Sequence, residues 1–395
     1  MPSVFQLGGT RADATPFARF GFSRNPFPEP GLDTGVYYTG HMQREIAEVN
    51  RWLQTVQNGQ GPVRPLAVRG ALGVGKTHLL KAIQSGLAET SGLSVLRKNL
   101  SEESMTRLLL SSLLLQSLPS GDGEMPEGME PSTLPLLDKV IAHGRATRHN
   151  EIRVALETLG VESMLAAPVK LIIGREESRE TAELRIWLAR WIARAHTTPV
   201  QRNKLGLAGP LDGEGQAIRV ATDLARLGRA AGEIKLWFVL IDQLEDLWRE
   251  GVITPGRRAR FLTDVRFLVD LALEGAPVAV LLAWNVAVAA REDLLKREYL
   301  ALWRRLGDPV DIPGLPAEDV WPFAQAYIVA APTTPKKTAR PEFVERLRGE
   351  GKDTVLDRLA SDPLAALGMQ RFASYRVLHH WREVAEDLAR AEEVR

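Results

Sequence analysis

Residues 70–77 read GALGVGKT and match the pattern G-x-x-x-x-G-K-[S/T] at every specified position. A short apolar run at residues 66–69 precedes them, and helical periodicity over residues 76–87 follows. A glycine-rich turn between a buried strand and a helix lets successive backbone N–H groups face a phosphate chain, at the positive end of the helix dipole. The sequence therefore predicts a phosphate-binding loop.

Individual residues of this loop have separate expected roles. Lys76 would reach the β- and γ-phosphates of a nucleotide, and the hydroxyl of Thr77 would bind Mg²⁺. His78 follows on the helix and is counted among the residues near the nucleotide. The expected nucleotide-contacting residues of the loop are Gly70, Gly73, Val74, Gly75, Lys76, Thr77 and His78. ATP and Mg²⁺ are the expected ligands.

A second apolar run, residues 236–241 (LWFVLI), ends directly before Asp242. A phosphate-binding loop needs an acid at the end of another buried strand to hold Mg²⁺ through water, and Asp242 stands at that position. The next residue is Gln243, whose neutral amide can orient water but cannot accept its proton, and Glu245 lies two residues further on. Two readings of Glu245 stay open, a catalytic base or a solvated carboxylate at a helix start.

Strand and helix patterns alternate around these motifs in the order of a parallel α/β sheet. Five strands are expected, at residues 66–69, 93–96, 236–241, 278–283 and 310–312. A large helical insertion is expected at about 102–232, with helices over 108–115, 155–166, 181–195 and 216–231 and a polar stretch at 119–131. The expected domains are an arm and helix over 1–60, a core over 61–315 and a helical lid over 316–395.

Composition restricts the class of protein. The 395 residues carry a net charge of +1, so no general electrostatic field attracts nucleic acid or membrane. The chain has no cysteine, which excludes disulfides, thiolate metal sites and cysteine nucleophiles. The longest apolar run, residues 277–290, is too short to span a bilayer. These features favour a cytoplasmic protein without a membrane partner.

Taken together, these motifs resemble those of AAA+ ATPases, in the branch that includes origin-recognition-like, STAND-type and transposition-helper proteins. The acidic segment at residues 240–247, LIDQLEDL, is similar to the D-Q-x-E form seen in STAND-type proteins. The arm is similar to that of transposition-helper ATPases, which covers the adenine, and this implies nucleotide contact by Asn25, Phe27 and Tyr38. The resemblance covers most of residues 20–115 and 230–395 but not the insertion.

The resemblance also implies three further site residues. Asn285 matches the polar residue that such folds place between the Mg²⁺-binding acid and the γ-phosphate. Arg305, or less favoured Arg304, matches an arginine that reaches the nucleotide of a neighbouring subunit, although an arginine at a helix end is also favourable for the dipole alone. Arg371, in the run GMQR that opens the last expected helix, matches a lid residue that contacts phosphate.

Two classes of function remain open at this level. The first is a DNA-associated regulator or loader that assembles as a homo-oligomer with ATP, and Arg257, Arg258 and Arg260, expected in a loop, are its candidate DNA contacts. The second is a STAND-like switch that acts on a protein partner, through the helical insertion. Adjacent His379 and His380 point about 100° apart on a helix, which disfavours joint metal binding.

Overall fold

The structure is a computed structural model of the whole chain. It describes residues 17–29, 38, 40–58, 63–88, 93–97, 134–146, 150–193, 195–211, 215–248, 253–286, 289–331, 340–363 and 371–392. The expected helix at 108–115 and the polar stretch at 119–131 lie outside these residues.

The chain divides into two compact units that are interleaved along the sequence. The loop unit combines Met1–Ile46, Gly70–Leu79 and Ile312–Arg395, and the sheet unit combines Ala47–Arg69 and Leu80–Asp311. This division differs from the three consecutive domains expected from the sequence, because the arm, the glycine-rich loop and the C-terminal helices belong to one unit.

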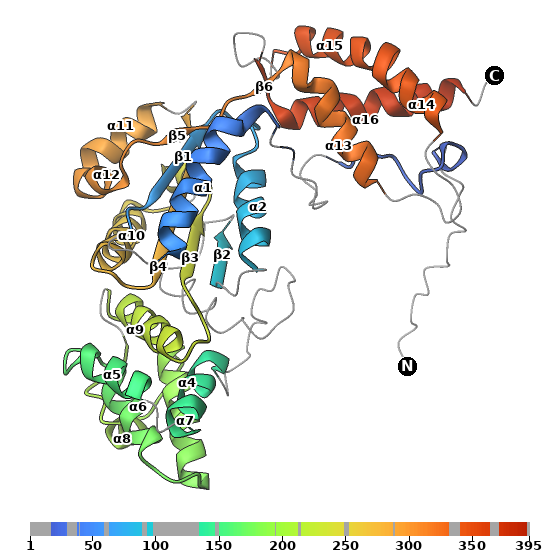
Figure 1. Cartoon of the computed structure of the whole chain (residues 1–395). Helices are drawn as coiled ribbons and strands as arrows, with labels where there is room; N and C mark the ends of the chain where they lie inside the picture. The colour runs from blue at the N-terminus through green and yellow to red at the C-terminus, as the bar shows by residue number, and fades with distance from the viewer. Residues whose placement is uncertain are drawn as a thin grey trace, which may run out of the picture. The chain divides into compact units, whose positions relative to one another are not determined.

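The sheet unit is built around a mainly parallel sheet (Figure 1). Its strands are β1 (Leu66–Gly70), β2 (Leu93–Arg97), β3 (Trp237–Ile241), β4 (Val278–Asn285) and β5 (Val310–Asp311), in the order β2-β3-β4-β1-β5. The pairs β2–β3, β3–β4 and β1–β5 are parallel. All residues of β3 and β4 are buried, as expected for strands covered on both faces. The prediction of a mixed α/β fold with a parallel sheet is confirmed.

Helices fill the chain between β2 and β3. They are α4 (Pro135–Ala146), α5 (Asn150–Leu159), α6 (Ala166–Ile173), α7 (Arg179–Ile192), α8 (Pro199–Lys204) and α9 (Gln216–Ala230). Figure 1 shows them gathered in one group. Over the described residues the insertion is helical as predicted, but the expected helix at 155–166 is wrong. Helix α5 ends at Leu159, because Gly160 adopts a left-handed conformation with φ 66°.

The sheet unit is completed by the 3₁₀ turn η4 (Leu244–Trp248) and the helices α10 (Pro255–Leu273), α11 (Ala289–Glu298) and α12 (Leu300–Leu306). Helix α10 begins where a loop was expected. Thr254 caps it by accepting a hydrogen bond from the Arg257 backbone N–H, and Pro255 occupies the first turn, where its missing N–H costs nothing. Arg257, Arg258 and Arg260 therefore lie on a helix, which corrects the expectation of a loop.

Two further helices, α1 (Gln43–Gln57) and α2 (Lys76–Ala88), cross the boundary between the units in the sequence. The remaining elements of the loop unit are η1 (Ala18–Phe20), η2 (Gly40–Met42), β6 (Leu315–Pro316), η6 (Ala317–Asp319), α13 (Val320–Ala330), α14 (Pro341–Arg346), η7 (Leu347–Gly351), α15 (Lys352–Ser361), β7 (Arg371–Phe372) and α16 (Ser374–Ala391). None of the described helices has the length and apolar character needed to cross a membrane.

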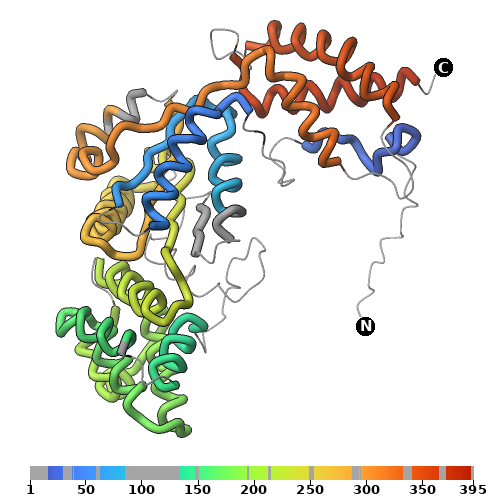
Figure 2. The backbone as a smooth tube through the Cα atoms, viewed as in Figure 1, coloured from blue at the N-terminus to red at the C-terminus, as the bar shows by residue number. Residues whose placement is uncertain are grey.

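Aromatic side chains of the N-terminal arm form part of the core of the loop unit. The ring of Phe20 stacks on Phe343 of α14 at a centroid distance of 4.0 Å, and Phe27 stacks on Trp381 of α16 at 5.5 Å. The backbone N–H of Arg340 donates to the carbonyl of Phe20. Figure 2 shows this arm in blue beside the red C-terminal helices. Burial of these rings ties the first part of the chain to its last helices.

Candidate functional site

The glycine-rich loop has the backbone geometry that its sequence predicts. Gly73 and Gly75 adopt φ values of 76° and 104°, a region that side chains disfavour. A β-carbon at Gly70 would lie 2.8 Å from the carbonyl oxygen of Ile312, so the backbone approach there requires glycine. The loop is thus a tight curl of backbone that ends in the first turn of α2.

Lys76, the first residue of α2, is buried, and its side chain folds back over the loop. Its Nζ donates to the carbonyl oxygens of Gly70 and Ala71, both at 2.8 Å. The ammonium charge is therefore held inside the curl, and half-buried Thr77 follows it on the helix. This concentrates positive charge where the loop N–H groups and the N-terminus of α2 lie.

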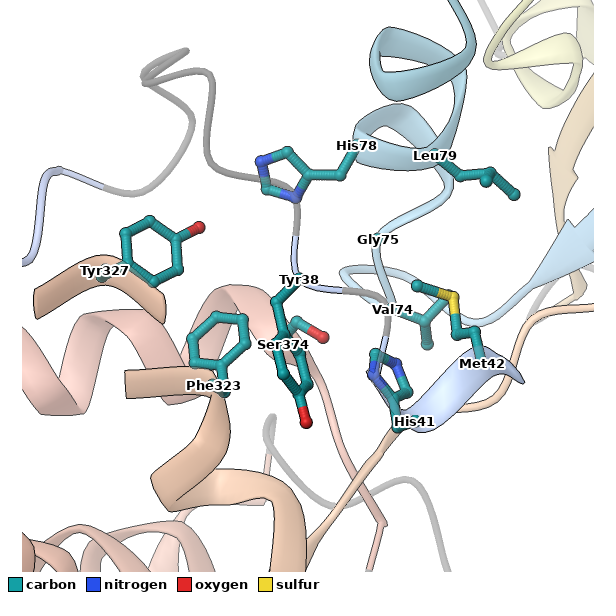
Figure 3. Close-up of a pocket in the computed structure, with 10 residues that line it drawn as sticks. All are labelled: Tyr38, His41, Met42, Val74, Gly75, His78, Leu79, Phe323, Tyr327 and Ser374. Atoms are coloured by element: carbon teal, nitrogen blue, oxygen red, sulfur yellow. The ribbon is translucent and has the colours of Figure 1, made fainter. Parts of the chain in front are cut away.

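A pocket adjoins the loop within the same unit (Figure 3). Its cavity volume is about 10 Å³, and it is partly open to solvent. Its walls come from different parts of the chain, namely the arm, the loop, α13 and the start of α16. The lining residues are Tyr38, His41, Met42, Val74, Gly75, His78, Leu79, Phe323, Tyr327 and Ser374. His78 and Tyr38 were expected near the nucleotide, and both line this pocket.

Tyr38 contributes an aromatic wall. Its ring lies nearly parallel to the His41 ring at a centroid distance of 5.9 Å and edge-on to Phe323 at 5.8 Å. Gly40 makes this possible, because a β-carbon there would lie 2.3 Å from the Tyr38 hydroxyl oxygen. Burial, with a smaller contribution from the charge of Asp319 and a hydrogen bond to it, raises the pKa of Tyr38 to about 12. The phenol therefore stays neutral at physiological pH.

The hydroxyl of Ser374, in the pocket wall, is buried and has no hydrogen-bond partner among the described residues. The two ring nitrogens of His41 are buried too, and the Pro313 carbonyl lies beside the ring. Buried polar atoms are nearly always hydrogen-bonded, so each exception needs an explanation, and a ligand is one. Burial lowers the pKa of His41 most, and Arg371 lowers it too, against opposing effects of Asp319, Glu45 and the Pro313 carbonyl. His41 is consequently a neutral donor and acceptor at pH 7.

The start of α16 lies directly against the loop. The backbone N–H of Tyr375 donates to the carbonyl of Gly73 at 3.2 Å, and a β-carbon at Gly73 would approach Ala373 to 3.2 Å. Ser374, not Arg371, opens this helix. Arg371 lies in β7, is exposed and donates to the carbonyl of Gly314 at 3.2 Å. The expectation that Arg371 begins the last helix is therefore wrong, although its charge acts on His41.

The other two arm residues serve packing. Phe27 is fully buried against Trp381. The Asn25 side chain accepts from the Phe27 backbone N–H at 2.9 Å and donates to the Arg382 carbonyl at 3.3 Å. Neither residue lines the pocket, so this position does not support their expected contact with nucleotide.

In the sheet unit, the residues of the expected acidic site lie at the carboxyl ends of β3 and β4. Asp242 follows β3 and is almost fully buried, and its Oδ1 accepts from the Gln243 backbone N–H at 2.9 Å. Glu245 Oε2 accepts from the backbone N–H of Asn285, the last residue of β4, at 3.2 Å. Gln243 has φ 57°, the one positive value for a non-glycine residue in the described ranges. The structure thus orients Glu245 towards the end of β4.

The two arginines at the end of α12 differ in their surroundings. Arg305 is paired with Asp270 of α10 and donates to the Ala301 carbonyl at 2.6 Å. Arg304 is exposed and makes no ion pair within the described residues. Arg305 therefore links α12 to α10, whereas the role of either arginine in another subunit stays a prediction.

The arginine cluster of α10 is likewise divided. Arg258 lies 3.8 Å from Glu298 and over the ring of Trp248, and its Nε is buried. Of the three arginines, only Arg257 and Arg260 are exposed, as expected of residues that contact a partner.

Neither protein-family models nor curated proteins match this chain. The site is therefore interpreted from its own residues. Sequence reasoning missed His41 and also Phe323, Tyr327 and Ser374, which lie about 250 to 300 residues after the loop. The signal for His41 was its position one residue after Gly40, at the start of an amphipathic helix.

Proposed function

We propose that this chain binds ATP with Mg²⁺ and acts as a nucleotide-controlled ATPase switch of the AAA+ type. The observation that carries the proposal is the pairing of a complete phosphate-binding loop with an aromatic pocket at its side. Left-handed Gly73 and Gly75 and the enclosed ammonium of Lys76 suit a chain of phosphates. A nucleotide needs this combination of a charged cradle and an adjoining flat apolar slot.

The base is proposed to lie in the pocket beside Tyr38. Stacking on Tyr38 and Phe323 would supply apolar contact, and the neutral imidazole of His41 and the hydroxyl of Ser374 would hydrogen-bond the edge of the base. The Ser374 hydroxyl is buried without a partner among the described residues, so a base that pairs with it removes an energetic cost of about 1–3 kcal/mol. This favours a nucleotide over inorganic phosphate alone.

Slow hydrolysis is proposed to use the acidic group of the sheet unit. Asp242 would supply a carboxylate for Mg²⁺, and Glu245 would act as base, helped by Asn285. The Mg²⁺ ion would supply charge neutralisation at the phosphates when bound.

Nucleotide occupancy would be sensed by the C-terminal helices. The pocket joins the arm and the loop to α13 and α16, so a ligand that contacts all four favours the arrangement in which they are together. A lid that responds to nucleotide in this way can control assembly into a homo-oligomer or release of a partner.

Nucleotide binding by purified protein tests the proposal. We expect ATP with Mg²⁺ to raise the melting temperature of the wild type, as a ligand of the native state does. Lys76→Ala should abolish this shift, whereas Lys170→Ala, which removes an exposed lysine of α6, should retain it. An equal shift in Lys76→Ala and wild-type protein would contradict the assigned site.

A further inference from the structure

Helix α16 carries a cluster of metal-ligating side chains that the proposed function does not use. His379, His380 and Glu383 each offer one ligand atom, and these atoms all lie within 4.8 Å of one another. His379 Nε2 lies 3.4 Å from Glu383 Oε1, and His380 Nδ1 lies 3.4 Å from Glu383 Oε2. The carboxylate, one helical turn on, lies between the two imidazoles and brings them into one group.

These separations suit a tetrahedral zinc ion. Bonds of about 2.0–2.1 Å at tetrahedral angles place neighbouring ligand atoms about 3.3 Å apart. Each imidazole lies 3.4 Å from a different oxygen of Glu383, close to that value, and one ligand atom from each of the three residues lies within 4.8 Å of the others. Adjacent histidines on a helix diverge, as noted from the sequence, but their ligand atoms need only converge on the carboxylate between them. Two imidazoles and a carboxylate are also a ligand set that zinc accepts.

The hydrogen bonds of His380 point to a cation. Its ring is buried, with Nε2 3.0 Å from Asp362 Oδ2 and Nδ1 facing Glu383. A neutral imidazole has one N–H, so donation to Asp362 leaves a lone pair on Nδ1 opposite a carboxylate oxygen. A cation between these two acceptors removes the mismatch. His379 lies beside the same carboxylate, with Nε2 3.4 Å from Oε1, which favours a metal ion shared by the three side chains.

Asp362 matches the outer ligand shell of a zinc site. A zinc-bound histidine commonly donates its second ring N–H to a carboxylate, which fixes the orientation of the ring. Asp362 is itself held by Arg376, whose Nε donates to Oδ2 at 2.7 Å. Arg358 donates to Glu383 Oε2 at 3.1 Å and to Asp387 at 2.8 Å. These arginines offset part of the negative charge of the carboxylates that they contact, so the net charge of the site is less negative than its acids alone would make it.

We propose that His379, His380 and Glu383 bind one zinc ion, with water as the fourth ligand and Asp362 as a positioning residue. Asp362 follows α15 and the ligands lie on α16, so the ion would reinforce the contact between these two helices. This site lies outside the pocket described above, and it does not depend on nucleotide binding.

The test uses the full chain, stripped of metal with a chelator and kept without nucleotide. Isothermal titration with Zn²⁺ should give one ion per wild-type chain. His379→Ala should weaken the affinity at least about tenfold, and Asp362→Asn about 10- to 100-fold. His196→Ala, which removes an exposed histidine of the sheet unit, should bind zinc like the wild type. Circular dichroism confirms that each variant is folded.

Two results would overturn the proposal. One is the absence of stoichiometric zinc binding by the wild type. The other is equal zinc affinity of His379→Ala and wild-type protein. Cobalt provides a second readout that needs no buried substitution, because tetrahedral Co²⁺ absorbs visible light much more strongly than octahedral Co²⁺. The strong absorption should appear in the wild type and disappear in His379→Ala and Glu383→Gln.

Discussion

At the scale of a single residue, His41 of the pocket makes the stability of the protein depend on pH. Its pKa in the folded protein is lowered by burial and by Arg371, so the unfolded chain binds a proton more readily than the folded one. The contribution of His41 to stability is therefore complete above its ordinary pKa of about 6.5, and it is lost as the pH falls from there through the lower folded pKa.

We expect the melting temperature of the wild type to fall as the pH is lowered from about 7 to about 5, and the fall to be smaller in His41→Gln, which cannot titrate. His196→Gln is the matched control, because that histidine is exposed. Thermal melts followed by circular dichroism measure the difference. Identical pH profiles in the wild type and His41→Gln would show that His41 is not held neutral by its surroundings.

The residue that handles the attacking water is the second question at this scale. We expect Glu245→Gln to lower the single-turnover rate of ATP hydrolysis by about 10²-fold or more, because only the carboxylate can accept a proton. Its carboxylate is already oriented by the Asn285 N–H. Gln243→Ala should have a smaller effect.

The left-handed backbone of Gln243 requires a control in this comparison. Alanine at that position retains the backbone strain, of order 1–3 kcal/mol, whereas Gln243→Gly relieves it. The two variants therefore separate loss of the amide from a change in stability. If both Gln243 variants lose more of the rate than Glu245→Gln does, the Gln243 amide orients the attacking water.

Helix α12 illustrates how an element determines the role of a side chain. Arg305→Ala removes the ion pair with Asp270 of α10, which is partly exposed, so we expect the free energy of unfolding to fall by up to about 1 kcal/mol. Arg304→Ala should leave stability unchanged and lower ATPase activity, if the exposed arginine completes a neighbouring site. Chemical denaturation and turnover measure the two effects, with Arg297→Ala as a control at another exposed arginine.

Mixing experiments test whether Arg304 acts on the nucleotide site of a neighbouring subunit. A mixture of Arg304→Ala and Lys76→Ala proteins should be more active than either protein alone, because a mixed interface can combine an intact loop with an intact arginine. Mixed oligomers without any regained activity would leave Arg304 as a solvated residue at a helix end.

The partner is a question for the whole molecule. A net charge of +1 provides no general attraction to DNA, and Arg258 is engaged with Glu298 and Trp248. Each chain would thus contribute few phosphate contacts, chiefly through Arg257 and Arg260. We expect DNA binding only with ATP, in the assembled form, with little sequence preference and a steep decrease as salt is raised.

A gel-shift series at several salt concentrations measures this binding. The double variant Arg257→Ala, Arg260→Ala should weaken it and flatten its salt dependence while ATP binding stays intact. No retained DNA at about 50 mM salt with ATP and Mg²⁺ would remove the DNA hypothesis, since phosphate contacts are strong at low salt. A protein partner, contacted through helices α4–α9, would then be the remaining hypothesis.

Local sequence determined the loop, the strands and the acid after β3. Residues 70–77 predicted a glycine-rich turn between a strand and a helix, and β1 and α2 flank such a turn, because spacing within one short segment strongly favours one backbone conformation. Apolar runs predicted β1, β3 and β4 within one or two residues, because buried parallel strands need continuous apolar character. A composition free of cysteine also excluded thiolate chemistry without reference to any fold.

Tertiary structure alone decided which distant side chains share an environment. Ser374 meets the loop, Arg305 pairs with Asp270, and Phe27 enters the core, although nothing near each residue in the sequence indicates its partner. The physical reason is that burial and pairing depend on long-range packing, which brings together residues hundreds of positions apart. The sequence therefore determined which chemical groups this protein has, and the packing decided which of them are available to a ligand.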